Sequence, residues 1–438
     1  MKLSLNWLND YIPIRDMDYV EVAQKMIMFG FEDTRFDREL ESLEDVVVGK
    51  ILKIERHPNA DKLSYCQVDS GTGVLNIVCG ATNIQEGNIV PLALEGAKLP
   101  NGVILKKSKI RGVESQGMMC SQKELQYGSD ASGIFILPQE WEVGKQVKDY
   151  LNDYIVSYEV KSNRPDLLSH VGVSRELSGL LSLPFLFPYI ESDSDFISDV
   201  KIEIENAEDC GRYVGKVIQG VEVKESGDLI RFRMNALGLQ PRNNVVDISN
   251  YVLFELGHPV HIFDKDKIEG GKVIVRRAKQ GEEITLLDGN QYKLDDTILV
   301  IADAVKPLAV AGIMGGLDSA VTFETKNIFI ESAHFNPVLI RRGAKKLGLQ
   351  TDASYRFERG TDIKGLETVA DRVAYLVKKE SHGQISANID VVKTKLPEEK
   401  VITIRVSRTN QILGAELSKG EIIKMLSDLH FKYIKDAD

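Results

Sequence analysis

The stretch that most constrains the fold covers residues 331–362 and joins a strand, a capped helix and a polar segment. It reads ESAHFNPVLIRRGAKKLGLQTDASYRFERGTD. An apolar run ahead of Glu331 predicts a buried strand that carries this carboxylate at its end. Asn336 and Pro337 are a typical N-cap and first helical residue, and Gly348 is a typical helix terminator. Polar groups from all three parts should therefore converge at one end of a rigid scaffold.

The composition is ordinary for a folded chain. Its 438 residues are 43% hydrophobic and 27% charged, and this length predicts roughly two to four domains. No apolar run approaches the ~20 residues that cross a bilayer, and the first residues lack the apolar core of a signal peptide, so we expect a cytoplasmic protein without membrane attachment. The cysteines are scattered without a CxxC pair, which predicts reduced structural thiols: Cys66, Cys79, Cys120 and Cys210.

Basic residues are concentrated in two islands of an acidic chain. The formal net charge is −10, which argues against a protein that coats nucleic acid nonspecifically. Residues 46–120 nevertheless hold nine Lys or Arg against six Asp or Glu, and residues 335–365 hold seven against three. This distribution favours a selective polyanion ligand. An ordinary solvated face remains the alternative for each island taken alone.

Residues 40–152 alternate short β-rich runs with turn signals, which predicts a small barrel of the OB type. Such barrels commonly bind oligonucleotides on one face, so the region is expected either to contact tRNA or single strands, or to be an ordinary barrel. Four basic residues are predicted to alternate along one strand near that face: Lys106, Lys107, Lys109 and Arg111. For His57, in HPNADKL, a turn-stabilising role is favoured over chemistry.

The rest of the chain divides around this barrel. A helix near residues 20–28 is too short to form a core alone, and a second helix ends before Pro184, so we expect the two to pack together around an inserted barrel. A large α+β region follows, with helices at 340–347 and 366–379. It contains neither GxxxxGK[ST] nor a GxGxxG that opens a helix, so nucleotide binding by those devices is not expected.

The final segment contains a capping-box pattern, Ser418 with Glu421, ahead of an amphipathic helix and a β-like HFKYI. We interpret this segment as the first part of a further domain, and the chain as a fragment of a longer protein.

Seven blocks, in order along nearly the whole chain, resemble the β subunit of bacterial phenylalanyl-tRNA synthetase: MKLSLNWLNDYIPI, VVVGKILKIERHPNADKL, KSNRPDLLSHVGVSRE, NNVVDISNYVLFELGHPVHIFD, AGIMGG, ESAHFNP and TDASYRFERGTD. The resemblance implies an α+β multidomain chain in which an OB-type β-barrel is inserted in a small α/β module. A large α+β B3/B4 editing domain and the start of a B5 domain follow. The implied divisions are a B1-like module (1–39 plus 153–195), the tRNA-binding barrel (40–152), the B3/B4 domain (200–392) and an incomplete B5 domain (400–438).

The resemblance also implies partners and an activity. Family members form an α2β2 complex that uses Mg and ATP to charge tRNA(Phe), with the aminoacylation site on the α subunit. No class II synthetase motif is evident in this chain, and neither Mg nor ATP is expected to bind it alone. The B3/B4 domain hydrolyses Tyr-tRNA(Phe) in this family. Such editing is intelligible, because an apolar pocket rejects an added hydroxyl by only about 10², whereas a second site can recognise that hydroxyl by buried hydrogen bonds.

The editing residues implied by the resemblance come from four blocks. Glu331 would accept the hydrogen bond of the tyrosine hydroxyl, with the backbone of Gly315 against the ring. His261 and Asn250 would face the ester and position water, with Arg242 on the same rim. The remaining members of the set are Asn243 and Asn244 on that rim, Thr351 and Ala353 in the pocket wall, and Ser249, where family members often have Thr.

Several alternatives stay open at this stage. Glu331 could be a buried structural acid and His261 a core histidine, and whether His261 acts as a base or positions water is not decided. His258 and His261 have HxxH spacing, but no third metal ligand is evident, so no metal site is predicted. Arg356 and Arg359 would meet the tRNA backbone or form salt bridges with neighbouring carboxylates, Glu358 or Asp362. The alternative function is a noncatalytic tRNA-binding and assembly scaffold with a decayed editing pocket.

Overall fold

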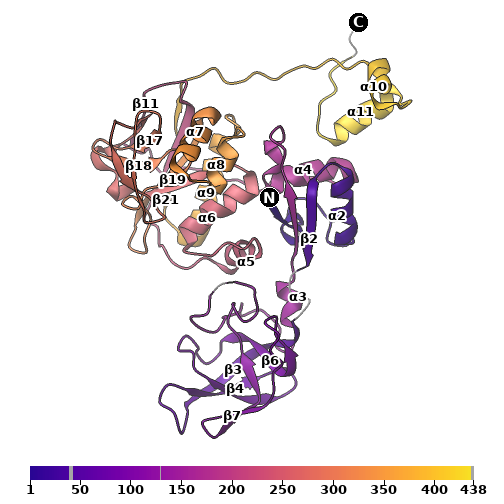
Figure 1. The fold of residues 1–438 in the computed structure, drawn as a ribbon, viewed down its shortest axis with the longest axis vertical. Coiled ribbons are helices and arrows are strands. Elements are labelled where there is room, and N and C mark those ends of the chain that lie inside the picture. Colours follow the sequence, from indigo (N-terminus) through magenta and orange to yellow (C-terminus); the bar gives the residue numbers. More distant parts are fainter. Residues whose placement is uncertain (39–42, 129, 436–438) are drawn as a thin grey trace.

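The computed structural model describes residues 1–38, 43–128 and 130–435. Figure 1 shows a strand-rich body at the bottom of the view, a small central body that contains the N-terminus, and a larger body beside it. Helices α10 (Val406–Leu413) and α11 (Lys419–Asp428) follow an extended segment at the top.

The small central body is an antiparallel sheet that joins segments far apart in the sequence. Its strand order is β1-β10-β2, and Lys2 lies opposite Ser157. The chain therefore leaves this sheet after β2 and returns to it at β10. The strands are β1 (Lys2–Ser4), β2 (Glu32–Arg38) and β10 (Tyr154–Glu159), and the helices are α1 (Leu5–Leu8), α2 (Tyr19–Met28), α3 (Val147–Leu151), the 3-10 turn η1 (Pro165–Leu167) and α4 (His170–Leu181).

Both helices expected here are confirmed. Asp18 caps α2 by accepting a hydrogen bond from the backbone N–H of Val20 at 2.8 Å, and Ser169 caps α4 in the same way. Val173 and Leu177 of α4 are fully buried with Val22 and Met26 of α2 in one core cluster. The two helices thus bury their apolar faces in one shared core, which neither could form alone.

The strand-rich body is a strongly curved antiparallel sheet of order β5-β4-β3-β6-β9, with a separate β7–β8 hairpin. Its two edges approach each other, since the backbone N–H of Gln116 donates to the carbonyl of Asn76 at 2.9 Å. Two clusters of buried apolar residues fill the body. The strands are β3 (Glu44–Arg56), β4 (Ser64–Asp69), β5 (Val74–Cys79), β6 (Ile89–Lys98), β7 (Ser108–Ile110), β8 (Val113–Ser115) and β9 (Gly117–Met119).

The larger body contains two five-stranded sheets and a layer of helices. One sheet has the order β13-β20-β12-β21, with β22 also pairing with β12, and the other has the order β11-β14-β17-β18-β19. The strands are β11 (Lys201–Ile204), β12 (Cys210–Gln219), β13 (Val260–Asp264), β14 (Lys272–Arg277), β17 (Leu299–Ala302), β18 (Pro307–Val310), β19 (Met314–Gly315), β20 (Asn327–Phe335), β21 (Gln384–Ile385) and β22 (Ile389–Val392), with the small hairpin β15 (Glu283–Thr285) and β16 (Gln291–Lys293) and the 3-10 turns η2 (Lys265–Lys267) and η3 (Glu269–Gly271).

The first sheet of this body is buried on both faces. One face, with Phe263 and Phe329, packs against the second sheet, and the other, with Ile262 and Ile330, packs against helices. The helices are α5 (Asp228–Ala236), α6 (Asn244–Leu256), α7 (Pro337–Leu347), α8 (Asp352–Phe357) and α9 (Leu366–Ser381). The expected helices at 340–347 and 366–379 are thus confirmed, and Gly348 ends α7 in the left-handed region at φ +68°.

Helix α5 joins the three bodies. Phe232 packs against Trp141 of the strand-rich body with ring centroids 5.7 Å apart, and its carbonyl accepts a hydrogen bond from Tyr127 at 3.2 Å. Arg233, the next residue, donates to Tyr251 of α6 and pairs with Asp10 of the small body at 2.7 Å.

The C-terminal prediction is correct in one part and wrong in another. The capping box of Ser418 and Glu421 is confirmed at the start of α11. The prediction of a strand at HFKYI is wrong, because residues 431–435 form no strand. The Nε2 atom of His430 instead lies 2.9 Å from Ser178 Oγ of α4. An apolar alternation without a neighbouring strand does not make a sheet. None of the helices in the described ranges is both long and apolar enough to span a bilayer.

Candidate functional site

Glu331 lies in the middle of β20, so the prediction that it ends the strand is wrong, and its side chain is on the face of the first sheet that meets the second sheet. The side chain is buried, with 6% of its surface exposed, and its Oε2 accepts a hydrogen bond from the hydroxyl of Tyr213 at 2.8 Å. Burial raises the pKa of Glu331 to about 7, because a carboxylate loses its hydration there, although the Tyr213 bond works in the opposite direction. No hydrogen bond to Oε1 occurs within the described ranges, so one oxygen can still accept.

His261 is the cross-strand neighbour of Glu331. The two residues are directly opposite on β13 and β20, so their side chains share one face of the sheet. The ring packs edge-on against Phe263, with centroids 4.4 Å apart, and Nε2 is shielded from solvent without a partner in the described residues. Burial lowers the pKa of His261 to about 4, so the imidazole is neutral at pH 7.

Gly315 closes the other side of this imidazole. A Cβ at position 315 would lie 2.2 Å from Cε1 of His261, so any side chain here would displace the ring. Thr351 is tied to the same turn, because its hydroxyl donates to the carbonyl of Ile313 at 2.9 Å while capping α8. Ala353 follows two residues later and is partly buried. The structure therefore brings Glu331, His261, Gly315 and Thr351 together.

Arg242, Ser249 and Asn250 are the expected site residues that come from another element, helix α6 and the residues before it. They lie on or just before α6, which packs on the opposite face of the sheet from Glu331. The hydroxyl of Ser249 donates to Val246 within its own helix at 2.7 Å, and the side chain of Arg242 is exposed. Throughout residues 1–38, 43–128 and 130–435, no hydrogen bond links these three side chains to Glu331 or His261.

The expected rim position of Asn243 and Asn244 needs correction. Asn243 is the N-cap of α6, accepting a hydrogen bond from Val246 N–H at 2.9 Å. Asn244 is fully buried, and its amide donates to the carbonyl of Glu222 and to Ser381. Both side chains hold the helix in place, so Asn244 cannot face a ligand on an open rim.

Tyr213 is the residue of this site that sequence reasoning missed. It lies in the buried strand β12, directly opposite Ala333. Its position beside Glu331 depends on the register of β12 with β20, and nothing in the local sequence of either strand fixes that register.

The HxxH pair does not form a metal site. His258 Nε2 lies 3.1 Å from the carbonyl of Ala333, and burial lowers its pKa to about 4. His261 points toward Gly315. The described part of the chain contains no group of three or more His, Cys, Asp or Glu side chains that could hold a metal ion.

The second basic island, residues 335–365, is partly structural. Arg356 is 2% exposed and donates to the carbonyl of Leu168 at 3.1 Å and to Asp352, so the suggested contact with a tRNA backbone is wrong for this residue. Arg359 forms the alternative salt bridge, to Glu358 at 2.6 Å. Arg356 thus joins α8 to Leu168, whereas Arg359, among the described residues, contacts only residues of its own segment.

The expected basic strand in the first island is also wrong in its geometry. Only Lys109 lies on a strand, the three-residue β7, whereas Lys106 and Lys107 precede it and Arg111 occupies a turn at φ +50°. All four side chains are exposed, and Lys107 pairs with Glu95 at 3.2 Å. The β-rich stretch is interrupted because residues 99–107 form a turn and an extended connection instead of a continuous strand.

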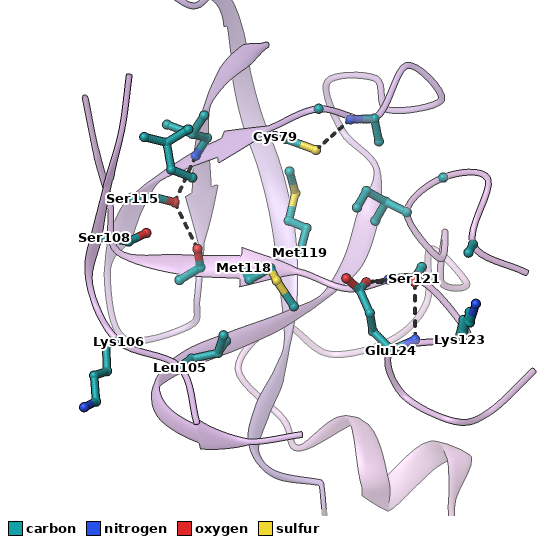
Figure 2. A pocket seen from close by; sticks show the side chains of 18 of the residues that line it. Cys79, Leu105, Lys106, Ser108, Ser115, Met118, Met119, Ser121, Lys123 and Glu124 are labelled. Carbon is teal, nitrogen blue, oxygen red and sulfur yellow. Dashed lines mark hydrogen bonds between the residues drawn. The ribbon is translucent and has the colours of Figure 1, made fainter. Parts of the chain in front are cut away.

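Two loops meet beside these basic residues. His57 accepts a hydrogen bond from Asn59 N–H at 3.1 Å, and its Nε2 lies 3.1 Å from the carbonyl of Ile110. The amide of Asn59 donates to the carbonyl of Arg111 at 3.0 Å. The turn-stabilising role of His57 is thus confirmed, and it also fixes the β3–β4 loop against the β7–β8 hairpin. A cavity of about 610 Å³ opens beside the same hairpin, shown in Figure 2.

Two domain families match this chain. The B3/4 domain matches residues 209–382, and the putative tRNA binding domain matches residues 46–146. The phenylalanine–tRNA ligase β subunit of Fusobacterium nucleatum subsp. nucleatum is 40% identical over 435 residues, covering 98% of this chain and 54% of that protein. The β subunit of Protochlamydia amoebophila is 41% identical over 443 residues, covering 100% of this chain and 55% of that protein.

Among solved structures, an N-terminal fragment of the phenylalanyl-tRNA synthetase β-subunit from Pyrococcus horikoshii is 17% identical and covers 64% of this chain and 77% of that chain. Its TM-score is 0.32, too low to establish a shared fold. The chain spans about half the length of the curated relatives it matches. From the identity over nearly all its residues and from the two matched domains, the chain belongs to the family of phenylalanine–tRNA ligase β subunits.

Proposed function

We propose that this chain acts in phenylalanine–tRNA ligase by binding tRNA(Phe) and hydrolysing Tyr-tRNA(Phe) in its B3/4 domain. The observation that carries the proposal is the group formed by Glu331, His261 and Gly315, in which a buried carboxylate lies beside a neutral imidazole. Charging with phenylalanine would occur at the α subunit of an α2β2 complex, with Mg and ATP, in the cytoplasm.

Selectivity would come from Glu331. Its Oε2 already accepts one phenol hydroxyl, that of Tyr213, and a substrate hydroxyl would be accepted by Oε1 in the same manner. Phenylalanine has no hydroxyl, so it would leave a buried carboxylate oxygen without a partner, and such a loss typically costs 1–3 kcal/mol or more. The pocket would therefore favour tyrosine, which an apolar aminoacylation site cannot strongly reject.

Hydrolysis would use a water molecule held near His261. The water oxygen adds to the ester carbonyl carbon, the bond from that carbon to the ribose oxygen breaks, and the ribose oxygen takes up a proton. The pKa of about 4 makes His261 a weak base, so we assign it the positioning of water through its unpartnered Nε2. Arg242, Ser249 and Asn250 are proposed to face the acylated end of the tRNA from α6, with Thr351 and Ala353 in the wall.

The strand-rich body would bind the tRNA as an OB-type barrel. Its strand order, together with the approach of β5 to β8 and β9, is that expected of a five-stranded barrel of this type. The binding surface would include the β7–β8 hairpin with Lys106, Lys107, Lys109 and Arg111. We propose the domain division stated for the sequence: 1–39 plus 153–195, 40–152, 200–392 and 400–438.

The test is deacylation of Tyr-tRNA(Phe) by this chain and by His261→Ala. We expect the substitution to slow tyrosine release about 10²-fold, the effect of misplacing a reacting group by roughly 1 Å, without changing tRNA affinity. His334→Ala is the matched control, because His334 lies on the same strand as Glu331 but on the opposite face. If neither form deacylates while both bind tRNA, the alternative holds: a noncatalytic scaffold with a decayed editing pocket.

A further inference from the structure

The cavity in the strand-rich body belongs to no part of the editing pocket. It measures about 610 Å³, which is within the usual range of small-ligand sites. It lies between the end of β5, strand β9, the β7–β8 hairpin and residues 131–134. Figure 2 shows Met118 and Met119 in its middle, close to Cys79. The floor of the cavity therefore consists of apolar, polarisable sulfur-containing side chains. The described residues that line the cavity include no aromatic ring.

One wall of the cavity presents a fixed carboxylate. Glu124 Oε2 accepts hydrogen bonds from the backbone N–H of Ser121 at 2.6 Å and from its hydroxyl at 2.7 Å. Glu124 Oε1 has no hydrogen-bond partner among the residues that the structure describes. The side chain is thus held by one oxygen while the other remains free to accept from a ligand, on the right of the cavity in Figure 2.

Two lysines that line the cavity form no ion pair with a described carboxylate. Lys106 and Lys123 both line it and are exposed, and neither forms an ion pair within the described ranges. The other carboxylate in the lining, Glu95, is paired with Lys107. Figure 2 places Lys106 and Lys123 on opposite sides of the two methionines. A chain of phosphates crossing the opening would meet a cation on either side.

We propose that this cavity holds one unpaired RNA nucleotide whose base carries an exocyclic amino group. The base lies against Met118 and Met119, its amine donates to Glu124 Oε1, and the flanking phosphates lie near Lys106 and Lys123. Thioether sulfur makes favourable contacts with aromatic rings, which include nucleobases. This inference rests on the tRNA-binding role proposed above and specifies which RNA feature the barrel recognises.

Comparing cytosine with uracil separates the effect of the proposed hydrogen bond from the effect of the size and shape of the base. Both are pyrimidines, but cytosine presents an amino donor where uracil presents a carbonyl oxygen, and a carboxylate is a recognised partner of the cytosine amine. Uracil's single base N–H lies between two carbonyl oxygens, which repel a carboxylate. Because the lining lacks an aromatic stacking platform, the hydrogen bond should decide the preference.

The first experiment measures binding of fluorescein-labelled hexamers, oligo-C and oligo-U, to the whole chain by anisotropy at modest salt. We expect oligo-C to bind about tenfold more tightly, the effect of one hydrogen bond to a charged group. Equal affinity for the two hexamers, or no binding of either, would overturn the proposal.

Glu124→Gln tests the carboxylate without emptying its position. The amide oxygen must face Ser121 N–H, because two donors would otherwise meet, so the amide N–H₂ faces the cavity. We expect the preference to reverse toward oligo-U, whose carbonyl accepts from that amide. An unchanged preference for oligo-C would overturn the proposal, and thermal unfolding of the variant verifies that the fold is retained.

Filling the cavity provides a second test. Ala131 lines it from an exposed loop, so Ala131→Trp should weaken oligo-C binding about tenfold. Val74→Trp is the matched control, since Val74 is 54% exposed in the same body and does not line the cavity. Equal effects of the two variants would contradict the proposal.

A tRNA(Phe) transcript, titrated at several salt concentrations, separates this proposal from the one it rests on. Salt-dependent binding of the transcript without a preference for oligo-C would contradict the cavity proposal and leave the proposed tRNA-binding role of the barrel intact. If the transcript does not bind and no preference for oligo-C is found, both proposals are contradicted.

Discussion

The strand-rich body and the larger body, which contains the matched B3/4 domain and is called the B3/4 body below, differ in how they use charged residues. Ion pairs of the strand-rich body are half exposed, as in Lys107 with Glu95, whose side chains are 51% and 54% exposed. The B3/4 body also has exposed pairs, such as Lys224 with Glu222, but it buries others, as in Lys216 with Asp371, whose side chains are 1% and 9% exposed. Exposed charge acts over a distance and is screened by salt, whereas buried charge fixes geometry. The first body is thus suited to attracting a polyanion, and the second to holding a small pocket rigid.

The largest expected effect is the loss of one partner of the buried pair. Asp371→Ala leaves the Lys216 ammonium buried and unpaired, so we expect the free energy of unfolding of the B3/4 body to fall by about 3–5 kcal/mol. Hydrogen exchange of β12 and α9 measures it. The double variant Lys216→Met/Asp371→Leu should recover most of the loss, and Glu95→Ala in the other body should have little effect. An equal loss for Asp371→Ala and Glu95→Ala would break the comparison.

The next effect is the pH dependence of stability that arises from Glu331. Its pKa in the folded chain, about 7, is above its ordinary value of 4.5, so the folded state retains a proton that the unfolded state has lost. This contribution is complete below pH 4.5 and disappears as the pH rises through 7, amounting to about 3 kcal/mol.

His258 and His261, with pKa values lowered to about 4, contribute the opposite slope between pH 4 and 6.5. Chemical denaturation across pH 4–8 gives the free energy of unfolding as a function of pH for the wild type and for Glu331→Gln. Subtracting the second curve from the first cancels the contribution of the two histidines. Parallel curves would show that Glu331 is not held in an apolar site.

A smaller effect is expected from a single methyl group at Gly315. A Cβ there would lie 2.2 Å from His261, so Gly315→Ala should displace the imidazole, cost about 1–3 kcal/mol and impair hydrolysis. Calorimetry and a deacylation assay measure the two. Gly73→Ala in the strand-rich body is the control, because a Cβ at 73 meets nothing within 4 Å. Similar behaviour of both variants would mean that the contact between Gly315 and His261 is not rigid.

The smallest effect concerns the exposed lysines. Lys106→Gln and Lys109→Gln should each weaken tRNA binding a few-fold and lower the slope of log affinity against log salt by about 1. Titrations between 50 and 200 mM salt measure the slope. A substitution of Lys216 should not change this slope, because that lysine is buried. If the slope does not change, the β7–β8 hairpin is outside the RNA interface.

The sequence predicts local elements well where caps and periodicity coincide. Asn336, Pro337 and Gly348 bound α7 as expected, because each acts through its own backbone neighbours. Counting charge was less informative. Arg356 belongs to a basic island, yet it is buried against Leu168, far away in the sequence. Charge counts do not show which side chains the tertiary fold will bury.

The candidate site was predictable only in part for the same reason. The resemblance to a family singled out Glu331, His261 and Gly315, and the structure brings them together. Tyr213, which occupies Glu331 Oε2, depends on strand register and could not be read from either strand alone. The neighbours of Asn244 in the chain predict a position on the rim, whereas the geometry of α6 buries its side chain in the core.

The most direct test of the proposed role of Glu331 compares the release of tyrosine and of phenylalanine from charged tRNA(Phe), by the wild type and by Glu331→Gln. The glutamine retains an oxygen for Tyr213 and presents an amide N–H₂, which cannot accept a hydrogen bond, toward the substrate hydroxyl. We expect the wild type to release tyrosine preferentially and Glu331→Gln to lose that preference at least tenfold, the effect of a hydrogen bond to a charged group. A preference for tyrosine that survives the substitution would contradict this role.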